Sequence, residues 1–257
     1  MKSPRFLWPH LWRSPFQRAK RCNFSGGSAV YKKICERGFL TKALDSWSID
    51  YFEDKFAKPD PWKYFTSTYE RTKYQRQLDI IKDRNPNPER ILEIGSAEGA
   101  QTLLLADQFP EANITAIEIS SNALERAKNN LLRFTDRVEL INADIAEYVP
   151  RIEDRCYDVC IWSESIYYLG ARLPLTTTYD LLGSVIDKLK DRGLLVMANT
   201  LGLPEGIPEH VVTKRPIIDC YYSLLSSLAS PVLKSSYSED KLGRTYEYQI
   251  WAFELKI

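Results

Sequence analysis

The sequence predicts an α/β fold in which a doubly wound, mostly parallel sheet ends in an antiparallel strand pair. From residue 89 onward, short apolar segments alternate with amphipathic, helix-like segments, as in a parallel sheet with helices on both faces. Tyr157–Ser163 is apolar enough for a strand that is buried on both faces. The last two predicted strands follow one another with no helical pattern between them. A C-terminal hairpin is therefore expected to complete the sheet.

Hydrophobic periodicity and turn residues place the elements along the chain. Ser120 or Ser121 is expected to cap one helix, and Gly193 to follow the end of another. The strands are predicted at Arg90–Gly95, Asn113–Ile119, Arg137–Asp144, Tyr157–Ser163, Gly193–Thr200, Val232–Glu239 and Tyr246–Ile257, and the helices at Ala100–Phe109, Ser121–Phe134 and Thr177–Asp191.

Composition excludes several classes of protein. The 257 residues are 44% hydrophobic and 27% charged, which supports a sizeable core. A net charge of +1 demands no polyanionic partner, so we expect no nucleic acid. Two histidines and five scattered cysteines without a C-x-x-C pattern argue against a zinc site or a disulfide framework. We therefore predict no metal site and a reducing, cytoplasmic location. No apolar run reaches 18 residues, so no stable membrane insertion is expected.

The chain divides into an N-terminal extension, residues 1–50, and a domain over residues 51–257. The extension is basic and aromatic, but Pro4, Pro9 and Pro15 argue against one continuous amphipathic helix. The sequence does not fix the oligomeric state.

The stretch RILEIGSAEGAQTLLLA, Arg90–Ala106, predicts a strand, a glycine turn and a helix. Gly95 allows a tight turn with positive φ, and Gly99 is expected to let the helix pack closely on the strand. Ala97 stands where dinucleotide loops carry a glycine for the pyrophosphate, and Glu98 would place negative charge beside phosphates. Both residues favour a cofactor without phosphates, such as S-adenosylmethionine. Glu93 is expected to orient the loop or to meet the cofactor's ammonium group through water.

Acidic residues also end the next predicted strands. Glu118 lies 23 residues after the first glycine, which suits the hydroxyls of a ribose. Asp144, followed by apolar Ile145, suits the amino group and flat face of adenine. Ser163 and Glu164 end the fourth strand at the expected mouth of the site. Taken singly, Glu118 could be a surface acid and Asp144 a helix cap.

The motifs LEIGSAEG, IEIS, NADI and SESIYYL, in this order, resemble the class I S-adenosylmethionine-dependent methyltransferases over about residues 60–257. The segment DPWKYFTSTYERTKY also resembles the nodulation-protein-S family, whose members N-methylate the deacetylated amine of a chitooligosaccharide. The resemblance implies a seven-stranded sheet with the last strand pair reversed, and an N-terminal helical cap, residues 51–88, over the cofactor. The first 50 residues have no counterpart in the family, which leaves the acceptor open.

In the cap, Trp62 and Tyr69 are expected to cover the cofactor, and Arg71 or Lys73 to meet its carboxylate. The alternative is a helix that packs its aromatic residues on the sheet edge. Together with the strand ends, the cofactor-binding residues are predicted to be Trp62, Tyr69, Glu93, Gly95, Ser96, Ala97, Gly99, Glu118, Ile119, Asp144, Ile145 and Ser163.

Methyl transfer to an amine or hydroxyl needs alignment and a base. The catalytic candidates are Glu164, Tyr168 and His210. Glu164 could equally hold the loop, Tyr168 could be packing beside Tyr167, and His210 could be a surface residue. The predicted function is methyl transfer to an amine or hydroxyl of a small molecule, a sugar or glycan in particular. An O-methyltransferase of a natural product and a non-catalytic binding protein are the alternatives.

Overall fold

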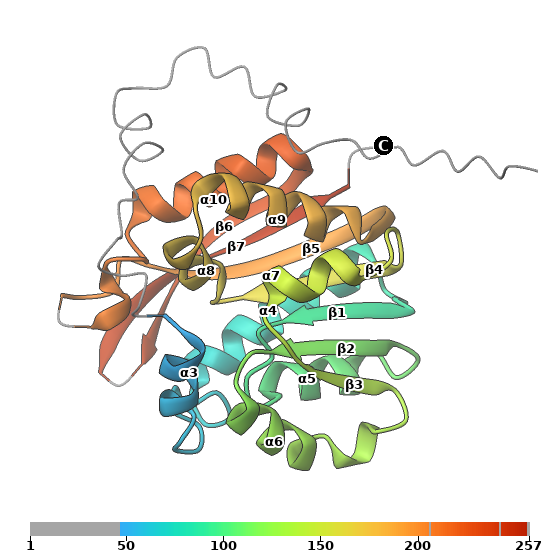
Figure 1. Cartoon of the computed structure of the whole chain (residues 1–257), viewed down its shortest axis with the longest axis horizontal. Coiled ribbons are helices and arrows are strands. Elements are labelled where there is room, and N and C mark those ends of the chain that lie inside the picture. The colour runs from blue at the N-terminus through green and yellow to red at the C-terminus, as the bar shows by residue number, and fades with distance from the viewer. Residues whose placement is uncertain (1–46, 206, 242, 256–257) are drawn as a thin grey trace, which may run out of the picture. The chain divides into compact units, whose positions relative to one another are not determined.

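The computed structural model describes residues 47–205, 207–241 and 243–255, so nearly all of the predicted extension 1–50 lies outside the described residues. The described part contains a seven-stranded sheet with the order β3-β2-β1-β4-β5-β7-β6 (Figure 1). β7 pairs antiparallel with both β5 and β6 and so runs opposite to the other six strands, as expected for a sheet that ends in a hairpin. The strands are β1 Arg90–Ile94, β2 Asn113–Glu118, β3 Val138–Asn142, β4 Tyr157–Ser163, β5 Leu189–Leu201, β6 Ser230–Lys241 and β7 Arg244–Glu254.

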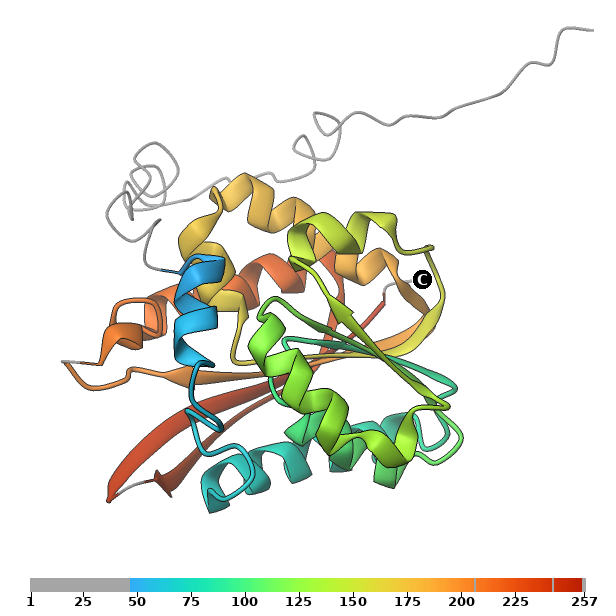
Figure 2. The ribbon, with the colours of Figure 1, turned by 60° about the horizontal axis from the view of Figure 1, so that its bottom comes forward.

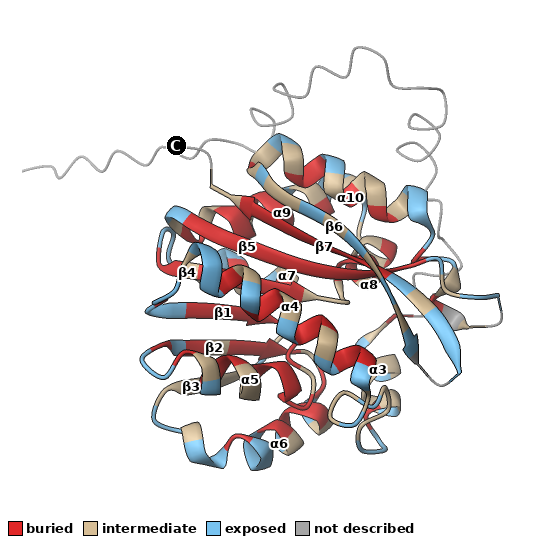
Figure 3. Cartoon of the chain, turned by 180° about the vertical axis from the view of Figure 1, so that it is seen from behind, coloured by how far each residue is buried: buried red, intermediate tan, exposed pale blue. Residues whose placement is uncertain are grey.

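Helices cover both faces of the sheet, which confirms the doubly wound prediction. The α-helices are α3 Ile49–Lys55, α4 Thr68–Arg84, α5 Ala100–Gln108, α6 Ser121–Asn130, α7 Ile145–Tyr148, α8 Ile166–Arg172, α9 Leu175–Asp187 and α10 Arg215–Leu228. Helices α4 and α5 lie on one face of the sheet, and α8, α9 and α10 on the other (Figure 3). Their buried side chains belong to two hydrophobic cores, one on each face. In β1, Ile91 belongs to the first of these two cores and Leu92 to the second. The strands between them are therefore buried on both sides, as their apolar sequences predict.

Several element ends differ from the predictions. The helix expected over 121–134 ends at Asn130 and continues as a short 3-10 turn, Leu132–Phe134. The fifth strand begins at Leu189 rather than Gly193, because Leu189 pairs with Tyr157 across an irregularity in the β4–β5 ladder. Helix α10 was not predicted from the sequence. No described helix is long and apolar enough to cross a membrane.

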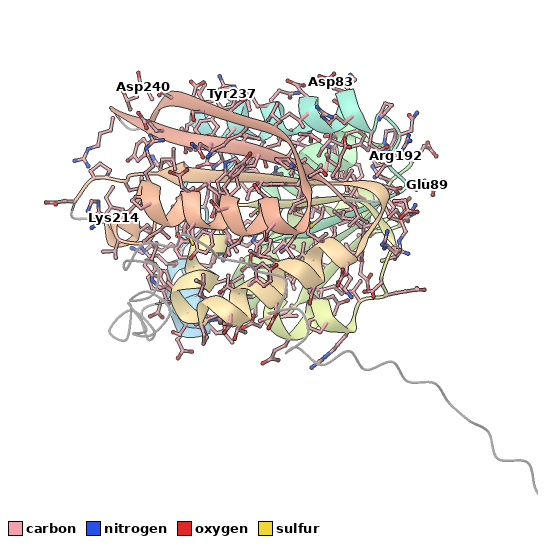
Figure 4. All side chains as sticks on the ribbon, turned by 90° about the horizontal axis from the view of Figure 1, so that it is seen from above. Asp83, Glu89, Arg192, Lys214, Tyr237 and Asp240 are labelled. Atoms are coloured by element: carbon pink, nitrogen blue, oxygen red, sulfur yellow. The ribbon has the colours of Figure 1, made fainter. Side chains whose placement is uncertain are left out.

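The carboxyl ends of the parallel strands face the N-terminal cap. The cap begins slightly earlier than predicted, with α3, and α3 lies against the start of α6 (Figure 2). Glu53 of α3 accepts hydrogen bonds from Ser120 Oγ at 2.8 Å and from the backbone N of Ser121 at 2.7 Å. A carboxylate at a helix N-terminus meets unpaired N–H groups and the positive end of the helix dipole. Glu89 and Arg192 lie at the opposite end of the sheet from Lys214 (Figure 4).

Gly170 fixes the packing of α8, the helix that carries Tyr168, against α10. A Cβ atom on Gly170 would lie 1.8 Å from the hydroxyl of buried Tyr221. We expect Gly170→Ala to lower the free energy of unfolding by about 1–3 kcal/mol, as overpacking of a core does. Chemical denaturation would measure this loss. Adding Tyr221→Phe should recover part of the loss, and no recovery would contradict this packing account.

Candidate functional site

A cavity of about 320 Å³ opens where the strands end beneath the cap. Ligands of doubly wound folds bind at this edge, because the strand order reverses there between β1 and β4. The structure brings most of the predicted site residues together around this cavity. They are Trp62, Tyr69, Glu93, Gly95, Ser96, Ala97, Glu118, Ile119, Asp144, Ile145, Ser163, Glu164 and Tyr168.

The glycine turn has the predicted conformation but a different packing partner. Gly95 has φ +76°, and a Cβ there would lie 3.0 Å from Ser165 Oγ. Gly99 has φ +84°, and its Cβ would lie 2.9 Å from Leu131 Cδ1. The close approach at Gly99 is therefore to the end of α6, not to the strand, and Gly99 does not line the cavity. Ala97 also adopts the left-handed conformation, with φ +49°, which an alanine adopts at some cost in strain.

Glu98 points away from the cavity and holds the cap instead. Its carboxylate accepts hydrogen bonds from the backbone N of Asp60, at 2.9 and 3.1 Å, and from Arg126 Nε at 2.7 Å. Glu98 is buried and does not line the cavity. The charge of Glu98 therefore does not bear on whether the ligand carries phosphates. The expectation that this charge would lie beside the ligand was wrong. Glu98 ties the glycine loop to the cap and to α6.

Glu118 and Asp144 both line the cavity, and both already have partners in the chain. Glu118 accepts from the backbone N of Ala97 at 2.8 Å and of Ser120 at 2.9 Å. Burial nevertheless raises the pKa of Glu118. Asp144 caps α7 by accepting from the backbone N of Ala146, and its other oxygen pairs with Arg172. The helix-cap alternative for Asp144 is thus correct, although its side chain still reaches the cavity. Carboxylate oxygens have further lone pairs to offer a ligand.

The glycine-loop end of the cavity holds buried polar atoms without partners. Glu93 Oε2, Ser96 Oγ and Gln101 Nε2 make no hydrogen bond among the described residues, although all three side chains line the cavity. Burial and the charge of Glu118 raise the pKa of Glu93 to about 8. Buried polar groups are rarely left unpaired, so a ligand with an ammonium group and hydrogen-bond acceptors fits this end. The amino-acid portion of S-adenosylmethionine has both. Gln101 was not predicted as a site residue.

A buried ion network closes the cavity beside β4. Lys73, only 1% exposed, lies 2.7 Å from Glu70 and 2.9 Å from Glu164. Glu164 also accepts from the Tyr167 hydroxyl at 2.7 Å and from the backbone N and hydroxyl of Thr200 at 3.1 and 2.7 Å. Burial alone would lower the pKa of Lys73, but the two carboxylates raise it, so the ammonium stays charged. Both oxygens of Glu164 are therefore engaged by the chain.

The remaining cap candidates divide between cavity and packing. Trp62 lines the cavity and contacts Phe56 at a centroid distance of 5.4 Å. Tyr69 also lines it, but its hydroxyl pairs with Thr200 at 3.1 Å and its ring packs on Tyr248 of β7. Arg71 is exposed and lies outside the cavity. Ser163 donates a 2.7 Å hydrogen bond to Gln77 of α4.

The end of the cavity away from the glycine loop is lined by aromatic side chains and by one acidic residue, Glu209. Tyr168 lies there, with its hydroxyl 3.5 Å from Glu209. Glu209 is 5% exposed and lines the cavity, whereas His210 does not. The His210 ring bonds to the carbonyl of Leu203. The 3-10 turn Pro208–His210 therefore turns the glutamate, and not the predicted histidine, toward the cavity.

Comparisons with known proteins identify the family of this fold. A family model described as a methyltransferase domain matches residues 87–238, more than half of the chain. The carboxy-S-adenosyl-L-methionine synthase of Nautilia profundicola is 29% identical over 193 residues, which cover 75% of this chain and 73% of that protein. A malonyl-[acyl-carrier protein] O-methyltransferase of Geobacter sulfurreducens is 32% identical over 95 residues, 37% of this chain and 34% of that protein.

Solved structures share the fold at low identity. The N-methyltransferase NodS of Bradyrhizobium japonicum, solved with S-adenosylhomocysteine, has a TM-score of 0.65 and 19% identity, and the match covers 80% of this chain and 97% of NodS. The 1,6-didemethyltoxoflavin-N1-methyltransferase of Burkholderia thailandensis has a TM-score of 0.61 and 12% identity, with 84% and 90% covered. The chain belongs to the methyltransferase domain family and is a class I S-adenosylmethionine-dependent methyltransferase whose fold resembles that of NodS.

Proposed function

We propose that the protein transfers a methyl group to an amine or hydroxyl of a small-molecule acceptor, a sugar or glycan in particular. The observation that carries this proposal is the two-ended cavity. One end has unpaired polar atoms beside the glycine loop, and the other has an aromatic wall that includes Trp47, Phe52 and Tyr168. Aromatic rings offer apolar faces for a sugar ring while their polar atoms bond to its hydroxyls. NodS, which has a similar fold, is by name an N-methyltransferase, and nitrogen is one of the two acceptor atoms proposed here.

We assign the cofactor to the glycine-loop end. Glu93 would face its ammonium group, and Ser96 and Gln101 its carboxylate. Glu118 would accept from the ribose hydroxyls, and Asp144 from the adenine amino group. Ile119 and Ile145 would flank the adenine ring, and the turn of Gly95, Ser96 and Ala97 would let the backbone approach the cofactor closely. Gly99 would act indirectly, by letting this turn pack against the end of α6.

When bound, S-adenosylmethionine supplies a methyl group on a sulfonium, whose carbon–sulfur bond breaks as the acceptor's lone pair bonds to carbon. The chain's own part is alignment, which contributes roughly 7–11 kcal/mol in favourable cases. We assign Glu164 to holding α4 and β5 at the cavity, because its oxygens already accept from Lys73, Tyr167 and Thr200. Burial and the charge of Glu209 raise the pKa of Tyr168, so its hydroxyl stays protonated and keeps its hydrogen bond to Glu209.

The two alternatives differ in what the cavity should contain. A non-catalytic binding protein with this fold would fill the cavity with side chains, whereas the cavity here measures about 320 Å³. An O-methyltransferase of a natural product would share the cofactor end and differ only in its acceptor. The predicted cytoplasmic location stays a prediction.

We expect Glu118→Ala and Asp144→Ala to weaken binding of S-adenosylhomocysteine by at least about tenfold, the usual effect of losing a hydrogen bond to a charged group. Isothermal titration calorimetry of the purified protein measures this. Glu125→Ala, an exposed change on α6, is the matched control. Unchanged affinity in both site variants would rule out this cofactor site.

Glu93 should make the ligand-free protein less stable as pH rises. Its folded pKa of about 8 lies above the ordinary value of 4.5, so the folded state holds a proton that the unfolded chain releases. Stability from this group is full below about pH 4.5 and is lost as pH rises toward 8. Glu93→Gln cannot titrate, so its melting temperature should gain on the wild type across this window. The same pH profile for both proteins, with Glu139→Gln as control, would refute the assignment.

The acceptor class can be found by product analysis. The protein with S-adenosylmethionine should add a mass of one CH₂ to members of a panel of amino sugars, glycans and polyols, as read by mass spectrometry. Saturable binding of S-adenosylhomocysteine with no product from any panel member would favour the alternatives above.

A further inference from the structure

Glu209 is a buried carboxylate that the cofactor assignment does not use. It lies in the turn between β5 and α10, at the aromatic end of the cavity. Its Oε1 accepts from the hydroxyl of Tyr51 at 3.2 Å and of Tyr168 at 3.5 Å. Burial and the negative charge of Glu209 raise the pKa of both tyrosines, so the two hydroxyls remain neutral donors.

Most of the other carboxylates at the cavity have a cationic side chain or backbone N–H groups as partners, which Glu209 lacks. Glu70 and Glu164 share Lys73, Asp144 pairs with Arg172, and Glu118 accepts from two backbone N–H groups. Within the described residues, Glu93 and Glu209 are the cavity carboxylates with neither a cationic side chain nor a backbone donor. Glu93 belongs to the cofactor end. Burying a carboxylate without a cationic partner costs free energy. The position of Glu209 therefore suits a cation bound in the cavity.

The surrounding rings suit a cation as well. Trp47, Tyr51, Phe52 and Tyr168, here called the aromatic cluster, contact one another in a closed series at centroid distances of 4.9, 5.2, 5.2 and 4.8 Å. Aromatic faces carry partial negative charge and attract ammonium groups. Lys55 already lies over the Tyr51 ring, with its Nζ 5.4 Å from the centroid, but does not line the cavity.

Trp47 adds a second requirement on the ligand. Its Nε1 is buried and has no hydrogen-bond partner in the described part of the chain, while the side chain is 4% exposed and lines the cavity. Indole N–H groups only donate, so this atom calls for an oxygen on the bound molecule.

We propose that Glu209 and the aromatic cluster form the ammonium-recognition site for the acceptor, which is an amine with a nearby hydroxyl or ether oxygen. This inference rests on the proposed function and decides between its two acceptor chemistries in favour of nitrogen. The amine loses one proton to solvent before it attacks, and the product regains the positive charge as the carbon–nitrogen bond forms. Glu209 therefore faces a cation in both the bound substrate and the product.

The test uses two probes that differ in charge alone. Choline carries a quaternary ammonium group and a hydroxyl, and 3,3-dimethylbutan-1-ol is its uncharged carbon analogue. Calorimetry of the full chain, saturated with S-adenosylhomocysteine, should show choline binding at least about tenfold tighter than the neutral analogue. Glu209→Gln should lower the affinity for choline by about tenfold or more and so remove this preference, because it keeps the shape and loses the charge.

Controls separate recognition from folding. Glu205→Gln, an exposed change in the same loop, should bind choline like the wild type. Glu209→Gln should keep the wild-type melting temperature and affinity for S-adenosylhomocysteine, and Glu209→Asp should retain part of the preference for choline. Equal binding of the two probes by the wild type, or an unchanged preference in Glu209→Gln, overturns the inference.

Failure of the proposed function looks different. If the wild-type chain does not bind S-adenosylhomocysteine, the proposed cofactor site is wrong. The two probes are then compared in its absence, and their relative affinities still test the role of Glu209. If the chain binds S-adenosylhomocysteine and methylates polyols but not amino sugars, the methyltransferase function stands and the assignment of an amine acceptor is wrong.

Discussion

The site depends on the ion pairs that the buried ammonium group of Lys73 makes with Glu70 and Glu164. The ammonium group joins α4 to the end of β4, since Glu70 lies one helical turn away and Glu164 directly follows the strand. Through Thr200, Glu164 extends the same network to β5. Removing one partner of such a buried set leaves an uncompensated charge, which typically costs about 3–5 kcal/mol. The left-handed conformation of Glu164, with φ +56°, is held in place by these contacts.

The glycine loop and the cap are held by charges of the same kind at the other side of the cavity. Glu98 reaches from the loop to Asp60 and Arg126, and Glu53 reaches from α3 to the start of α6. The glycine loop that lines the cavity is therefore also the anchor of the cap. Negative side chains in this region serve the packing of the chain as much as the binding of a ligand.

The fold and the gathering of the strand-end residues around the cavity could be predicted, because local sequence patterns determine both. Strand periodicity, the turn at Gly95 and Gly99, and acids at successive strand ends are all visible within short windows of sequence. The acceptor end could not be predicted in this way. Whether Glu209 or His210 faces the cavity depends on the rotation of one 3-10 turn, and no sequence period records that. The expectation for Glu98 was wrong for a related reason, because its partners Asp60 and Arg126 lie 38 and 28 residues away in the sequence.

The division of the cavity between two sets of segments has an evolutionary consequence. The proposed cofactor end is built mainly from the strand ends of the sheet, whereas the proposed acceptor end comes from the segment around α3, from α8 and from the turn after β5. Replacements at Trp47, Phe52 or Glu209 change one end without touching a residue of the other. A lineage with this architecture can exchange its acceptor while its methyl donor stays the same, and the two halves can diverge at different rates.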